Sequence, residues 1–234
     1  MEEQGRVISI VLVTLVISLL AGVMIRGVVS LPTDATGLTQ QVDSNLERSG
    51  VENPVTAVLL NFRGYDTWLE LGVLLLAVWG VLGVHRASNL SNVEQTPSTN
   101  HSLLWLVRWL TPAMVLVAGY LLWLGKFAAG GAFQSGVLLA VVAVLLWFAG
   151  FRSLTGISPI LWKATLLVGF VGFALAGSLF MLLGRRFLEF SPDTAGTVIL
   201  WVEAAAAISI GATFAGLFFG LQRERYTDEE DFSP

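Results

Sequence analysis

The 234 residues of this chain are 55% hydrophobic and only 13% charged, and their mean hydropathy is +0.74. Soluble domains carry about 25% charged residues, so this composition excludes a water-soluble globular protein and indicates an all-α, polytopic integral membrane protein. The net charge of −4 and the lack of a basic patch with interleaved aromatics argue against a nucleic-acid partner. The chain has no cysteine, which excludes disulfides and thiolate metal sites, and its two histidines both flank a polar linker. We therefore expect no cofactor, no metal centre and no enzymatic chemistry.

The apolar segments are taken in chain order, with about 20 mainly apolar residues required for a membrane-spanning helix. The first run follows the net acidic start MEEQGR and is longer than the 7–15 residues typical of a signal-peptide core, so it predicts a retained transmembrane helix. About six transmembrane helices are predicted, over Val7–Ile25, Thr67–Val84, Leu103–Leu124, Phe133–Phe148, Ile160–Leu183 and Thr197–Leu221.

Two polar interruptions divide these segments. The loop from Arg26 to Asp66 is long enough to hold a short surface helix, which we place at Asp43–Arg48. Residues 86–102 are rich in Ser, Asn, Thr and Pro, a composition typical of linkers. We therefore predict a two-helix unit over 1–85, a linker over 86–102, a four-helix unit over 103–222 and a polar, acidic, mobile tail over 223–234. Lys and Arg near the span ends divide almost equally between the two sides, so the positive-inside rule assigns no orientation.

Three ionisable residues, Arg63, Asp66 and Glu70, stand at the entry to the second span. A spacing of four residues puts both carboxylates on one face of a helix. A carboxylate at membrane depth costs roughly 2.5–3.5 kcal/mol and is usually retained for ion or proton work. Two neighbouring carboxylates cannot easily both stay ionised there, so one is expected to hold a proton. The alternative for Asp66 is a headgroup-level position in the first turn of the helix, where the helix dipole favours an acidic residue.

Glu203 lies within the sixth span among small residues, which allow close packing against a neighbouring helix. Its carboxylate is expected to face protein or water, either paired with Arg108 or Lys163 or as part of an ion path. Arg108 and Lys163 themselves fit snorkelling or anchoring in the headgroup region. The glycine-rich turn over 125–136 joins the third and fourth spans; it is a tight hairpin on physical grounds, and unwound backbone lining an ion path is the alternative.

Two stretches resemble a known family. The segment NPVTAVLLNFRGYDTWLE resembles the E subunit of membrane-bound hydrogenase complexes and the C-terminal extension of the A subunit of Mrp-type cation/proton antiporters. It carries both expected motifs, Asn53-Pro54-Val55-Thr56-Ala57-Val58 and Phe62-Arg63-Gly64-Tyr65-Asp66-Thr67. The unit from about Leu103 to Gln222 resembles the B subunit of the same antiporters, with Pro112 in the helix before the turn. The turn retains Gly125, Gly130, Gly131, Phe133 and Gly136, whereas Lys126 replaces a histidine, Phe127 an asparagine, Ala129 a proline, and Ala132 and Ser135 two glycines.

The resemblance implies an accessory membrane subunit of an Mrp-like monovalent cation (Na⁺)/proton antiporter or related ion-translocating complex. It implies location in the cell (inner or plasma) membrane, and as partners the lipid bilayer, large antiporter-like subunits, other small subunits and a redox module as a further candidate. In that family the acidic pair that matches Asp66 and Glu70 is implicated in the cation or proton route. The candidate ion- or proton-path residues are Asp66, Glu70, Arg63, Glu203 and Lys126.

Two alternatives stay open. The chain could be a structural membrane scaffold that anchors a redox or carbon-converting partner to antiporter-like subunits, its charges serving as ties between helices. An independent small transporter is a third hypothesis, but the two units show neither an inverted repeat nor a substrate-sized polar cluster.

Overall fold

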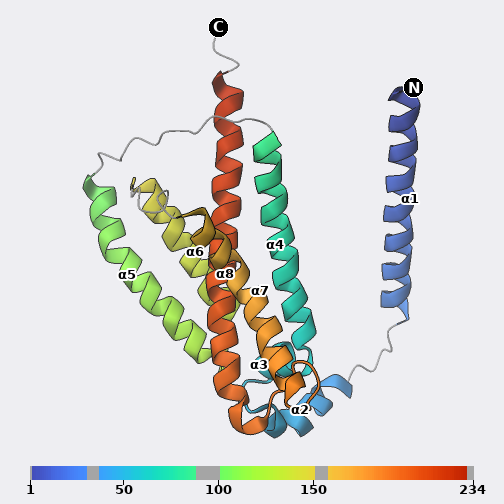
Figure 1. Ribbon diagram of the computed structural model, residues 1–234, viewed down its shortest axis with the longest axis vertical. Helices are drawn as coiled ribbons and strands as arrows, with labels where there is room; N and C mark the ends of the chain where they lie inside the picture. Colours follow the sequence, from blue (N-terminus) through green and yellow to red (C-terminus); the bar gives the residue numbers. More distant parts are fainter. Residues whose placement is uncertain (1, 31–36, 88–100, 151–157, 231–234) are drawn as a thin grey trace. The chain divides into compact units, whose positions relative to one another are not determined.

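The computed structural model describes residues 2–30, 37–87, 101–150 and 158–230, and the regular elements in these ranges are all helices (Figure 1). Five helices are long and apolar enough to cross a membrane, and a sixth apolar helix, α6, is shorter at 17 residues. The predicted all-α, multi-pass membrane fold is thereby confirmed. The five long helices are α1 (Glu2–Val29), α4 (Gly64–Ala87), α5 (His101–Leu124), α7 (Pro159–Leu182) and α8 (Pro192–Glu230), and α6 covers Ala132–Phe148.

The chain divides into two compact units, Met1–Gln41 and Val42–Pro234. The first unit contains α1, whose side chains from Val11 onward are all exposed. Helix α2 (Gly37–Ser49) contains the short surface helix predicted at Asp43–Arg48 and is longer than predicted.

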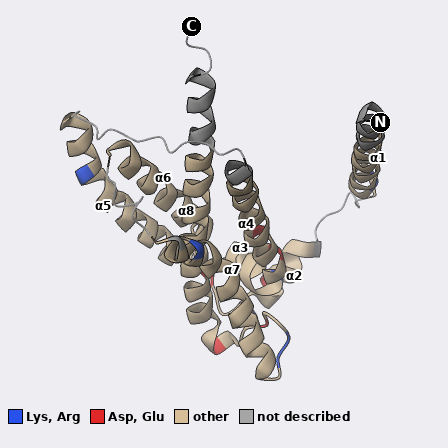
Figure 2. Ribbon diagram, turned by 45° about the horizontal axis from the view of Figure 1, so that its top comes forward, with Lys and Arg blue, Asp and Glu red and all other residues tan. Residues whose placement is uncertain are grey.

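In the second unit, α8 is the central helix and packs against α4, α5, α6 and α7. Few charged residues lie along α5, α6, α7 and the part of α8 up to Gly220 (Figure 2). Small residues allow the helices to approach closely: a Cβ on Gly136 of α6 would lie 2.7 Å from Ile210, and one on Gly169 of α7 would lie 2.8 Å from Ser209. The largest fully buried apolar side chains are Phe173, Leu71, Leu166, Ile199, Ile210, Val78 and Val107.

Local signals explain where two of the helices begin. At α7, the Ser158 hydroxyl accepts a hydrogen bond from the Leu161 backbone N–H (3.2 Å), and a proline follows at the first helical position. At α3 (Pro54–Ala57), Asn53 caps the helix by accepting from the Val55 N–H (3.0 Å), again followed by proline. The short helix α3 continues into a single π-helical turn, η1 (Val58–Phe62), before α4.

The helix bounds differ from the predictions at several ends. Helix α4 begins at Gly64, so that Asp66 lies inside the helix, and α3 with η1 occupies what was predicted as the end of a loop. Helix α8 begins five residues before Thr197 and continues to Glu230, so most of the predicted tail is helical. Residues 88–100 of the predicted linker and 231–234 of the tail lie outside the described residues, and the division into units 1–85 and 103–222 stays a prediction.

Candidate ion-path site

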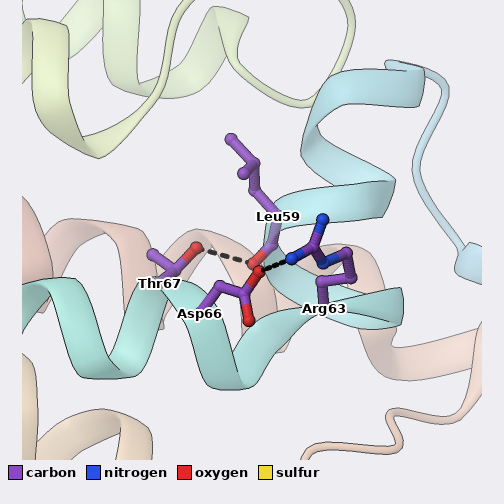
Figure 3. Close-up of polar contacts among 4 residues, drawn as sticks. All are labelled: Leu59, Arg63, Asp66 and Thr67. Carbon is purple, nitrogen blue, oxygen red and sulfur yellow. Dashed lines mark hydrogen bonds and ion pairs between the residues drawn. The ribbon is translucent and has the colours of Figure 1, made fainter. Parts of the chain in front are cut away.

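The two residues of the predicted acidic pair, Asp66 and Glu70, lie in different surroundings. Asp66 lies in the first turn of α4, where the alternative interpretation placed it, and forms an ion pair with Arg63 (Figure 3). Both side chains are partly exposed, at 60% for Arg63 and 45% for Asp66. The Thr67 hydroxyl donates to the Leu59 carbonyl (2.8 Å) and fixes the junction between η1 and α4. Arg63 thus balances the charge of Asp66 at the edge of the bundle.

Glu70 lies one turn further along α4 and is exposed, with no ion pair among the residues that the structure describes. The position of Glu70 along the axis of the helix bundle follows from the contacts of the residues on either side of it. The Trp68 indole N–H donates to the carbonyl of Phe170 (3.0 Å), and a Cβ on Gly72 would lie 3.2 Å from the Phe170 ring. Because Phe170 is at the middle of α7, Glu70 lies close to the middle depth of the helix bundle while facing away from its core.

Glu203 is the one charged side chain buried among the described residues, with 5% of its surface exposed. Its carboxylate accepts a hydrogen bond from the backbone N–H of Ala132, at the N-terminus of α6. A Cβ on Gly131 would lie 2.6 Å from the carboxylate oxygen Oε1, and Gly131 has φ +108°. Position 131 therefore requires glycine both for its backbone conformation and for the space that the carboxylate occupies. A helix N-terminus stabilises negative charge at this place.

Glu203 and the turn beside it lie within the length of the candidate span of α8. Glu203 is about 11 residues into α8, or roughly 16 Å along its axis at 1.5 Å per residue. The middle of the candidate span Pro192–Gly220 is only one turn further, at Ala206. Non-helical backbone at this depth is tolerated only where protein satisfies its polar groups or where it lines a water-filled cavity.

The segment before α3 satisfies these backbone groups. The Asn53 side-chain amide donates to the carbonyls of Gly125 (3.1 Å) and Ala128 (2.6 Å), and the Thr56 hydroxyl donates to Gly125 (2.5 Å). The backbone N–H groups of Glu52 and Asn53 both donate to the Lys126 carbonyl, at 3.2 and 3.0 Å. Asn53 and Thr56 are buried. The two stretches that carried the family resemblance are therefore in direct contact, and we call Asn53 and Thr56 the turn clamp.

The sequence analysis missed the turn clamp, although two signals were present. Asn53 followed by proline is a helix-capping pattern, and Thr56 is a hydroxyl residue within an otherwise apolar run. Neither signal indicated that the partner would be a turn about 70 residues away.

Lys126 is half-buried and extends along α8. A Cβ on Gly196 would lie 2.8 Å from the Lys126 Nζ atom, and Gly196 is two helical turns before Glu203 on the same face of α8. Arg108 and Lys163 are exposed. Neither of these two residues, nor Lys126, forms an ion pair with Glu203 in the part of the chain that the structure describes. The arrangement is a buried carboxylate at a helix N-terminus, with an amine about 10 Å away along the helix axis.

Two solved structures share the fold of this chain. The chain matches one solved chain of the membrane-bound sulfane sulfur reductase (MBS), an archaeal respiratory membrane complex, with a TM-score of 0.64 and 21% identity over 90% of this chain and 97% of the other. It matches a chain of the Mrp complex from Dietzia sp. DQ12-45-1b with a TM-score of 0.65 and 21% identity over 91% of this chain, which spans 26% of that longer chain. No curated relative matches.

At this level of identity the two structures show a shared fold, and both likenesses extend beyond the unit predicted over 103–222. The sequence itself matches a family model described as a domain related to the MnhB subunit of the Na⁺/H⁺ antiporter, over residues 102–219. The predicted resemblance of this unit to an antiporter B subunit is confirmed. The chain belongs to the family of domains related to the MnhB subunit of the Na⁺/H⁺ antiporter.

Proposed function

We propose that this multi-pass membrane protein is an accessory subunit of an Mrp-like Na⁺/H⁺ antiporter or related ion-translocating complex in the cell membrane, and that its intramembrane carboxylates belong to the ion path. The observation that carries the proposal is Glu203, a buried carboxylate that lies within a candidate membrane span and beside a non-helical glycine turn. Ionisable groups at such positions usually mark ion or proton routes.

In this proposal Glu203 holds either a proton or, in exchange, a monovalent cation. The N–H of Ala132 at the start of α6 stabilises the ionised carboxylate, so that it can release a proton without a basic side chain in contact. The amine of Lys126 lies beside Gly196, two turns of α8 before Glu203. Its positive charge limits how strongly the Glu203 carboxylate retains a cation. Glu70 and Asp66, with Arg63 balancing Asp66, form the second acidic group, at the outward side of α4.

The proposal is tested with Glu203→Gln in the purified complex. Glutamine is nearly isosteric and can still accept from the Ala132 N–H, but it neither takes up a proton nor balances a cation. We expect complex recovery to be unchanged while Na⁺-dependent dissipation of a pH gradient in vesicles is lost. Unchanged transport in an intact complex would remove Glu203 from the ion path.

A structural scaffold is the second candidate function, favoured by the turn clamp and by the Arg63–Asp66 pair, both of which tie segments together. The fold shared with a chain of a respiratory complex is compatible with it. In that case the carboxylates are ties between helices, and Glu203→Gln, which retains the hydrogen bond from Ala132, would leave transport per complex unchanged. The ratio of transport to assembled complex therefore separates the two functions.

A further inference from the structure

The outward face of α4 differs from an ordinary lipid-facing surface. Glu70, Val73, Ala77 and Gly80 fall on one side of the helix and are all exposed, beside the exposed apolar residues Leu69 and Leu76. Val73 is 64% exposed, and no atom lies within 4 Å of a Cβ placed on Gly80. The opposite side of α4 is buried through Leu71, Leu75 and Val78, so nothing in this unit covers the outward face.

The contacts of Trp68 and Gly72 with Phe170 place Glu70 close to the middle depth of the bundle. A carboxylate facing hydrocarbon at this depth is strongly disfavoured, and acidic side chains within spans almost always face protein or water. Small residues such as Ala77 and Gly80 also allow another helix to approach closely. The acidic group and the small residues share one face, so one neighbouring helix can satisfy both.

Helix α5 provides the contrast. Its exposed side chains include Trp105 and Trp109 in mutual contact near one end and Tyr120 and Trp123 in contact near the other. From residue 105 to residue 123 the helix rises about 27 Å, close to the hydrocarbon thickness of a bilayer. Aromatic residues at both ends of a span are typical of the two membrane interfaces, and the surface between them, including Leu116, carries no acidic residue. The outward face of α5 has the pattern of a lipid-facing surface.

We propose that the outward face of α4, formed by Glu70, Val73, Ala77 and Gly80, is the docking surface for a transmembrane helix of another subunit, which places a cationic side chain opposite Glu70. The proposal rests on the proposed function in one respect, namely that the chain works within a complex. Charge complementarity selects a cation, because Glu70 is the one ionisable residue among these four and forms no ion pair with the described residues of its own compact unit.

The chain has no cysteine, so single cysteines can carry a nitroxide spin label. We would label Val73→Cys on α4 and Leu116→Cys on α5 in the purified complex in lipid, and measure collision with dissolved oxygen, using the unsubstituted complex as background. The Val73 label is expected to be immobilised, with oxygen accessibility several-fold below that of the Leu116 label. Equal, high accessibility at both positions would overturn the docking surface. Loss of the other subunits with the Val73 label alone would support it, because a lipid-facing position tolerates the label.

The charge of the partner is tested by reversal at Glu70. Glu70→Lys places a cation opposite a cation and is expected to lower the ratio of co-purified subunits to this chain at least several-fold, whereas Glu70→Gln, which only removes the counter-charge, is expected to lower that ratio less. Recovery of Glu70→Lys at the level of Glu70→Gln would overturn the cationic partner. If no other subunit co-purifies with the unsubstituted chain, the proposed function fails together with the docking surface. An intact complex with a lipid-exposed Val73 label contradicts the docking surface alone.

Discussion

Replacing Asn53 by alanine removes the main support of the glycine turn, and the structure allows the cost to be estimated. The Ala128 carbonyl loses its hydrogen bond from the Asn53 amide, and because this bond is only partly buried its loss costs about 0.5–1.5 kcal/mol. Helix α3 also loses its N-cap, at about 1 kcal/mol. The Gly125 carbonyl retains the Thr56 hydroxyl, so the loss there is small. The total is about 1.5–2.5 kcal/mol.

For a unit of this size, a loss of about 1.5–2.5 kcal/mol corresponds to a fall in melting temperature of roughly 3–10 °C. The assay is thermal unfolding of the purified complex, followed by the reactivity of a cysteine introduced at the buried position Ala206 in this cysteine-free chain. The matched control is Thr56→Ser, which retains the hydroxyl and is expected to unfold near the parent temperature. If Asn53→Ala unfolds at the same temperature as Thr56→Ser, the turn clamp does not stabilise the fold as argued.

Three further predictions concern the charged residues and the turn. Gly131→Ala is expected to displace the Glu203 carboxylate, because the new Cβ would lie 2.6 Å from Oε1, and therefore to lower transport. Gly119 has open space around it, so Gly119→Ala is expected to leave transport unchanged in the same vesicle assay. Glu70→Gln is expected to abolish transport per recovered complex; unchanged transport per complex would remove Glu70 from the ion path. Lys126→Gln is expected to lower the Na⁺ concentration for half-maximal transport. Removing the Lys126 charge about 10 Å away reduces its repulsion of a cation at Glu203 by on the order of 1–2 kcal/mol. An unchanged Na⁺ dependence would contradict this role of Lys126.

The spans, the antiporter-like unit and the candidate carboxylates could be predicted because they depend on local composition and motif. The direction in which the Glu70 side chain faces could not be predicted. In a membrane helix the lipid is as apolar as the protein core, so the apolar residues of α4 show no periodicity that separates Val73 from Leu71. The sequence identified the carboxylate but gave no signal for what surrounds it.

The contact between Asn53 and the turn was equally inaccessible, because it joins residues 72 and 75 positions apart through single hydrogen bonds. The space at Gly131 depends on Glu203, which comes from a different helix. Such long-range polar contacts decide the geometry of the site, and local patterns do not encode them.

The most direct test of the central claim, that this chain is a subunit of a cation/proton-translocating complex, is purification of the tagged protein in mild detergent with mass spectrometry of what co-purifies. We expect large antiporter-like membrane subunits in stable, defined amounts. Recovery of the chain alone, or only with further copies of itself, would contradict the claim and favour an independent transporter.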